Sequence, residues 1–131
     1  MKSRPLLFTC GLYAGITFLH LIKVPDAPEA VRDIPYLDKC IHLVMFALLV
    51  MTTLRCSLNN QRLGVWQTIY RIIFCLAYAV LMESLQDYLT EFRSFEWGDI
   101  AADAGGIIVG WSLARKPILA FFFEHKIWKA A

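Results

Sequence analysis

Residues 40–54, CIHLVMFALLVMTTL, contain no Lys, Arg, Asp or Glu. A soluble amphipathic helix must expose a polar face about once per turn, and this stretch has none. Three more stretches share this character, with at most one charged residue each: 5–22, 63–82 and 100–114. A helix needs about 20 residues to cross a hydrocarbon core of roughly 30 Å, and each stretch approaches that length. The sequence therefore predicts an all-α, integral membrane bundle of four transmembrane helices, with spans at about 5–22, 38–54, 66–86 and 98–114.

Composition supports one membrane domain over residues 1–131. The chain is 58% hydrophobic with a mean hydropathy of +0.52, which makes a buried bundle in a soluble oligomer the weaker alternative. Lys2 and Arg4 precede the first apolar stretch, as in a signal peptide, but no small-residue cleavage site follows, so we expect a retained helix. A net charge of +2 gives no reason to expect nucleic acid as a partner.

The basic residues predict the orientation of the helices. Nine of the 13 Lys and Arg residues fall on the side that holds both termini and the middle loop, and basic residues near span ends stay in the cytoplasm. Ten of the 11 acidic residues fall on the other side, with Glu124 as the exception. We therefore expect both termini inside, an acidic outer face, and a short interfacial segment along the inner surface after Pro117.

Polar side chains gather near the outer ends of three predicted helices. His42 follows Asp38 by one turn, Gln86 follows Glu83 by nearly one turn, and Asp103 lies about one turn inside the fourth span. Each alone has a plain explanation, such as a solvated carboxylate or a hydrogen-bonded core histidine. Because ionisable groups inside a span are costly, their convergence at one depth indicates a functional site.

The fourth predicted helix carries one narrow stripe. Asp99, Asp103, Gly106 and Gly110 lie at offsets 0, 4, 7 and 11, which places them on one face. Gly-x-x-x-Gly spacing permits close helix approach, so Gly106 and Gly110 are expected to serve helix packing. Ile107 and Ile108 are expected to lie off the stripe.

These residues resemble the pattern of the VanZ-like family of small membrane proteins associated with teicoplanin resistance. The similarity covers roughly Tyr36 to Trp111 and rests on motifs that occur in the same order: Asp38-Lys39-x-x-His42, Glu83-x-x-Gln86, Arg93, and Asp99-x-x-x-Asp103-x-x-Gly106-x-x-x-Gly110. The resemblance implies a four-helix protein of the bacterial cytoplasmic (inner) membrane. The family pattern usually has asparagine at the position of Asp103, so this chain adds a potential negative charge.

Two functions fit this pattern. In the first, an outer polar cavity binds an amphiphilic envelope component or limits the action of a lipid-bearing glycopeptide, through ligand-binding residues Asp38, Lys39, His42, Glu83, Gln86, Arg93, Asp99 and Asp103. In the alternative, the protein is a membrane-embedded enzyme acting on an envelope lipid or glycan precursor, with His42, Glu83 and Asp103 as catalytic candidates. No nucleophile motif accompanies them, which favours binding over catalysis. The expected partners are the lipid bilayer and such an amphiphile, with a homo-oligomer or a larger envelope complex left open.

The charge balance of the predicted cavity is negative. Four carboxylates are expected there, on Asp38, Glu83, Asp99 and Asp103. The positive charges are those of Lys39 and Arg93, together with that of His42 when its imidazole is protonated. Water in the cavity, a protonated carboxyl group or a bound cation would each resolve the surplus, and we expect a proton shared between Glu83 and Asp103. We expect no cofactor and assign no metal. A divalent cation is the lesser alternative, with calcium or magnesium ahead of zinc because a single histidine is expected nearby.

Overall fold

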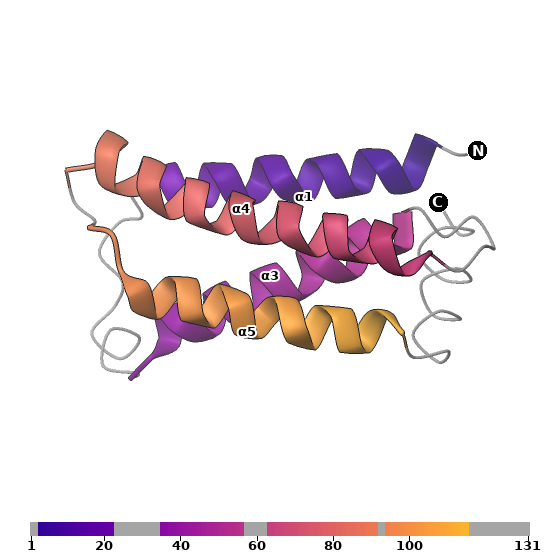
Figure 1. The fold of residues 1–131 in the computed structure, drawn as a ribbon. Coiled ribbons are helices and arrows are strands. Elements are labelled where there is room, and N and C mark those ends of the chain that lie inside the picture. The colour runs from indigo at the N-terminus through magenta and orange to yellow at the C-terminus, as the bar shows by residue number, and fades with distance from the viewer. Residues whose placement is uncertain (1–2, 23–34, 57–62, 92–93, 116–131) are drawn as a thin grey trace.

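The computed structural model describes residues 3–22, 35–56, 63–91 and 94–115, and within them it has four α-helices and no strand. The helices are α1 (Ser3–Leu21), α3 (Leu37–Cys56), α4 (Val65–Leu89) and α5 (Trp97–Ala114). Successive helices run in alternating directions (Figure 1). The all-α architecture predicted from the sequence is confirmed. The segment after Pro117, Arg93 and most of the loop between the first two helices lie outside the described residues.

The tightest helix pair is α3 with α5, and two glycines make it possible. A Cβ atom on Gly106 would overlap the backbone oxygen of Leu43 and lie 3.1 Å from the amide nitrogen of Ala47. A Cβ on Gly110 would overlap the backbone oxygen of Ala47. Only residues without side chains allow two helix backbones to approach this closely.

The other contacts place α3 and α4 at the centre of the bundle. Both contact α1 and α5, whereas the described parts of α1 and α5 do not contact each other. The core between them contains Phe46, Leu49, Val50, Cys75, Ala79 and Ile107, all 5% exposed or less. The burial of Ile107 corrects the expectation that packing on this helix is confined to the stripe of Gly106 and Gly110. The helix α5 packs against both α3 and α4, so it buries an arc wider than that stripe.

Hydrogen bonds of tyrosine and threonine hydroxyl groups join α1 to the central helices. The Tyr78 hydroxyl donates to the backbone oxygen of Tyr13 at 2.8 Å and lies 2.8 Å from the Thr17 hydroxyl. The Tyr13 hydroxyl lies 3.2 Å from that of Thr53 on α3. Such links between helices stabilise a bundle in lipid, where apolar side chains gain little by leaving the solvent.

Arg71, the charged residue inside the third apolar stretch, also has a partner. Its Nη1 donates to the backbone oxygen of Thr53 at 2.6 Å. Thr53 lies in the last turn of α3, where carbonyl groups have no partner within the helix. Arg71 therefore caps the carboxyl end of α3.

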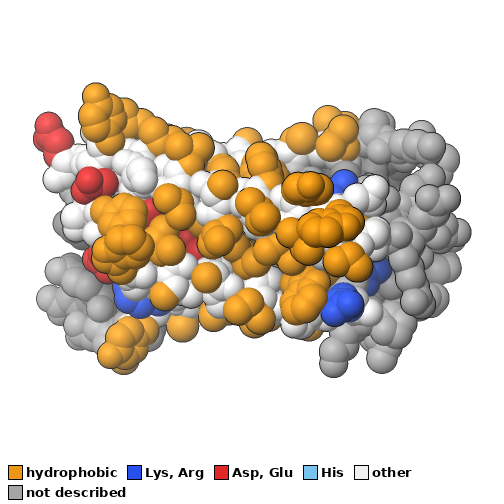
Figure 2. All heavy atoms as spheres, viewed as in Figure 1, with side chains coloured by type: hydrophobic (Ala, Val, Ile, Leu, Met, Phe, Trp, Pro, Cys, Tyr) orange, Lys and Arg blue, Asp and Glu red, His pale blue; other side chains and the backbone are white. Residues whose placement is uncertain are grey.

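Large apolar side chains cover the outside of all four helices. Exposed examples on each helix include Leu7 and Phe18, Val44, Trp66, Tyr70 and Phe74, and Ile108. Figure 2 shows apolar side chains along the length of the bundle, with acidic side chains gathered at the left end. By length and hydropathy, residues 37–55 of α3 and the whole of α4 are able to cross a membrane.

Candidate functional site

A buried imidazole–carboxylate pair lies between α3 and α5. Nδ1 of His42 is 3.0 Å from Oδ1 of Asp103, and the two side chains are 2% and 1% exposed. The close α3–α5 approach at Gly106, one turn along α5, brings these side chains together. In the neutral imidazole this bond puts the proton on Nδ1 and the lone pair on Nε2.

Glu83 brings a second buried carboxylate from α4. Its Oε1 accepts the backbone N–H of Glu96 at 2.9 Å, at the start of α5. Its Oε2 has no hydrogen-bond partner among the described residues, and the same holds for Oδ2 of Asp103. Buried carboxylate oxygens normally have partners, so each of these atoms requires an explanation.

Lys39 closes the rim of the cluster. Its Nζ lies 2.9 Å from Oδ1 of Asp99 and 3.1 Å from Oε2 of Glu96. The Asp99 side chain is 4% exposed and that of Glu96 is 55% exposed, so the pair with Asp99 is the better shielded. The charge on Lys39 is therefore already neutralised by carboxylates of the chain itself.

The remaining predicted site residues differ in their burial. Gln86 is 2% exposed and lies nearly one turn beyond Glu83 on α4. Its backbone oxygen accepts the Thr90 hydroxyl at 2.5 Å where α4 ends. Asp38 lies at the start of α3 and is more exposed than His42. The structure thus brings His42, Glu83, Gln86, Asp99 and Asp103 into the buried part of one end of the bundle.

His20 on α1 is a site residue that the sequence interpretation missed. Its ring packs edge-on against His42, with ring centroids 5.0 Å apart and an interplanar angle of 74°. Its Nδ1 donates to the backbone oxygen of Ile16 at 2.9 Å. The expectation that a single histidine lies near the site is therefore wrong. The available signal was its position, since His20 is the one ionisable side chain other than Cys10 and Tyr13 within the apolar stretch 5–22.

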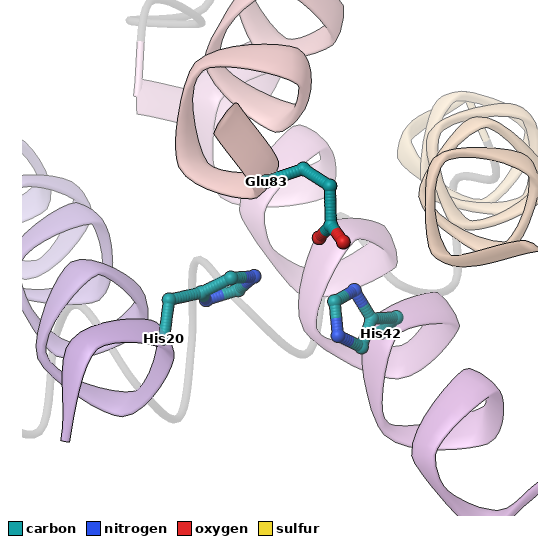
Figure 3. Close-up of side chains that lie close together, drawn as sticks. All are labelled: His20, His42 and Glu83. Atoms are coloured by element: carbon teal, nitrogen blue, oxygen red, sulfur yellow. The ribbon is translucent and has the colours of Figure 1, made fainter. Parts of the chain in front are cut away.

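His20, His42 and Glu83 come from three different helices and point toward one another (Figure 3). One potential ligand atom from each lies within 4.8 Å of the other two, and all three side chains are buried. Asp38, His42 and Asp99 form a second group that meets the same distance limit. His42 thus belongs to both groups.

A model of the VanZ/LLP1 family matches residues 6–123 of the chain, which include most of α1 and the whole of α3, α4 and α5. The chain belongs to the VanZ/LLP1 family. The match covers every residue of the buried cluster, so the cluster lies within the family domain. No significant match was found among curated proteins or solved structures.

Proposed function

We propose that this VanZ/LLP1 family member crosses the bacterial inner membrane with all four helices, with both termini in the cytoplasm. The apolar exterior of every helix supports this arrangement, because a soluble protein rarely exposes such an area of large apolar side chains. The acidic end of the bundle then faces outward, in agreement with the distribution of basic residues in the sequence.

Within this arrangement, we propose that the outer end of the bundle binds the polar head group of an amphiphilic envelope component. The burial of His42, Glu83 and Asp103, each 2% exposed or less, carries this proposal. An ionisable group deep in a span costs about 2.5–3.5 kcal/mol on insertion scales, so several together are expected where a ligand or ion uses them.

The chemistry of the cluster favours a head group with hydroxyl or amine donors. Glu83 and Asp103 each have one carboxylate oxygen without a partner in the described part of the chain, and such oxygens accept hydrogen bonds strongly. Sugar hydroxyls and ammonium groups supply suitable donors. A lipid-bearing glycopeptide carries the same donor groups and an acyl chain that anchors it in the membrane. By binding these donor groups, the site would limit the action of teicoplanin.

Lipid retention tests this proposal directly. The protein is purified in mild detergent, and co-purified lipids are measured by mass spectrometry for the wild type, Glu83→Gln and Asp87→Asn. Asp87 is exposed and lies one turn from Glu83 on the same helix, so it is a matched control. We expect one lipid class to be depleted in Glu83→Gln only. Identical lipid profiles in all three proteins contradict head-group binding.

Drug susceptibility tests the second part of the proposal. Cells that express the wild type should tolerate more teicoplanin than cells that express Glu83→Gln at the same level, with Asp87→Asn resembling the wild type. A glycopeptide without an acyl chain should show a smaller difference, because it has no membrane anchor. Equal teicoplanin susceptibility of all strains would show that the protein does not contribute to teicoplanin resistance.

The hydrogen bond between His42 and Asp103 favours a second candidate function, acid–base catalysis on a bound envelope lipid or glycan precursor. A carboxylate that holds an imidazole in one tautomer prepares its other nitrogen to move a proton, and Glu83 is a second acid or base nearby. Extracted envelope lipids incubated with the protein would be analysed for products. Turnover that disappears in His42→Gln and persists in Asp87→Asn would establish an enzyme, and absence of turnover with retained lipid would leave binding alone.

A further inference from the structure

We propose that His20, His42 and Glu83 bind one divalent transition-metal ion of the zinc type. One donor atom from each side chain lies within 4.8 Å of the others. Metal–ligand bonds of about 2.0–2.2 Å in a tetrahedron place donor atoms roughly 3.4 Å apart. Small side-chain rotations are therefore enough to close the three donors around an ion.

The type of donor selects the metal. Two imidazole nitrogens and one carboxylate oxygen are a common set for Zn²⁺ and other first-row divalent ions, whereas Ca²⁺ and Mg²⁺ prefer oxygen ligands throughout. The presence of His20 beside His42 reverses the sequence-based preference for calcium or magnesium over zinc, which assumed a single nearby histidine.

Each proposed ligand is held by an oriented partner, as metal ligands in proteins usually are. Nδ1 of His20 donates to the backbone oxygen of Ile16, and Nδ1 of His42 bonds to Asp103. Oε1 of Glu83 accepts the backbone N–H of Glu96. The first two bonds keep the lone pair of each neutral imidazole on Nε2, which prepares that atom for coordination.

A divalent ion also resolves the charge of the cluster. Glu83 and Asp103 are each 1% exposed, and Oε2 of Glu83 has no hydrogen-bond partner among the residues described. Two buried carboxylates without neutralising charge would repel each other at high cost. One ion with two positive charges balances both and supplies the missing partner of Glu83.

The second group, Asp38, His42 and Asp99, is the poorer candidate. Oδ1 of Asp99 already pairs with the Lys39 ammonium group at 2.9 Å. That positive charge would repel a metal ion and would compete with it for the carboxylate. We therefore assign the ion to the three-helix group of His20, His42 and Glu83.

This metal site goes beyond the proposed head-group binding and does not depend on it. Three protein ligands leave at least one coordination position for water or for an oxygen atom of a bound molecule. Metal content is measurable without any lipid, so failure of lipid retention and failure of metal binding are separate results.

Metal titration tests the assignment. The full-length protein, purified with an affinity tag that contains no histidine, is stripped with a chelator, and its binding of Zn²⁺ is measured in detergent. We expect about one ion per chain for the wild type, and binding weakened about 100-fold or more in His20→Gln and in Glu83→Gln. Asp87→Asn is the control and should bind as the wild type does, whereas Asp99→Asn tests the second group.

Several results would overturn the proposal. Wild-type binding no stronger than that of Glu83→Gln would exclude a metal site there. Binding lost in Asp99→Asn and kept in His20→Gln would move the ion to the second group. Because a variant that unfolds also loses binding, X-ray absorption at the zinc edge of the wild type provides an independent readout. We expect scattering from two imidazoles, and one imidazole or none contradicts the proposal.

Discussion

The carboxylate of Asp103 on α5 holds the imidazole of His42 on α3 through a 3.0 Å hydrogen bond, with both side chains excluded from solvent. The bond joins the two helices that pack most closely. It therefore links the chemistry of the site to the packing of the bundle.

Replacing Asp103 should reveal how much this hydrogen bond contributes to the stability of the protein. Asp103→Asn keeps an oxygen acceptor at the same position, whereas Asp103→Ala leaves Nδ1 of His42 buried without one. We expect Asp103→Ala to lower the free energy of unfolding by about 1–3 kcal/mol and Asp103→Asn by clearly less. Reversible unfolding in mixed detergent measures both. Equal losses for the two variants would mean that the hydrogen bond contributes nothing.

The glycines of α5 provide a sharper test of helix packing. Gly106→Ala adds a Cβ that would overlap the backbone oxygen of Leu43, and a helix backbone cannot move as a side chain does. We expect a loss of about 1–3 kcal/mol or more. Gly105→Ala is the matched control, because its Cβ would meet only the Leu43 side chain at 3.8 Å. Melting temperatures that fall equally in both variants would contradict the packing described here.

Tyr78 should contribute through its hydroxyl group. Tyr78→Phe removes the bonds to Thr17 and to the backbone of Tyr13 while keeping the ring. A hydrogen bond between membrane helices contributes about 0.6–1.7 kcal/mol, and we expect a loss in that range. Tyr70→Phe on the same helix removes an exposed hydroxyl and should be neutral in the same unfolding assay. Neutral behaviour of both variants would show that α1 docks without this link.

The Lys39 contacts predict unequal effects at the rim. Lys39→Met leaves Asp99 buried without its cation, whereas Glu96→Gln removes a carboxylate that is mostly in solvent. An exposed ion pair contributes about 0.2–1 kcal/mol and a shielded one more, so Lys39→Met should destabilise the protein further than Glu96→Gln. Unfolding at low and high salt checks the comparison. A larger effect of Glu96→Gln would reverse the assigned roles of the two carboxylates.

Cysteine labelling tests the proposed orientation. Ser94 and Gly64 are both exposed and lie at opposite ends of the bundle. In a cysteine-free background, Ser94→Cys should react in intact cells with a thiol reagent that does not cross membranes. Gly64→Cys should react only after the cells are opened. The opposite pattern would put the polar cluster on the cytoplasmic side.

The sequence predicted the architecture because its signals were local. Apolar stretches with at most one charged residue each predicted four helices. Helical spacing placed Asp99, Asp103, Gly106 and Gly110 on one face, which is the face buried in the structure. His42, Glu83 and Asp103 were expected at a common depth because each lies near the outer end of its helix. These inferences need only the rise and the period of a helix.

The sequence could not predict features that depend on how one helix is rotated against another. The approach of His20 to His42 follows from how α1 packs on α3, which no spacing within either segment encodes. Ile107 was expected to lie off the packing stripe, but α5 packs against both α3 and α4 and Ile107 is buried. The end of α4 at Leu89, three residues beyond the predicted span, reflects the bond from the Thr90 amide to Gln86.

The backbone contact at Gly106 and Gly110 also sets the alignment of α3 and α5 along their axes. One helical turn rises about 5.4 Å, so sliding α5 by a fifth of a turn would move Asp103 by about 1 Å and break its bond to His42. The glycines thus set the axial position of Asp103 relative to His42. A substitution there that leaves the protein folded would still move Asp103 away from His42, so its effect on the proposed ligand binding would exceed its effect on stability.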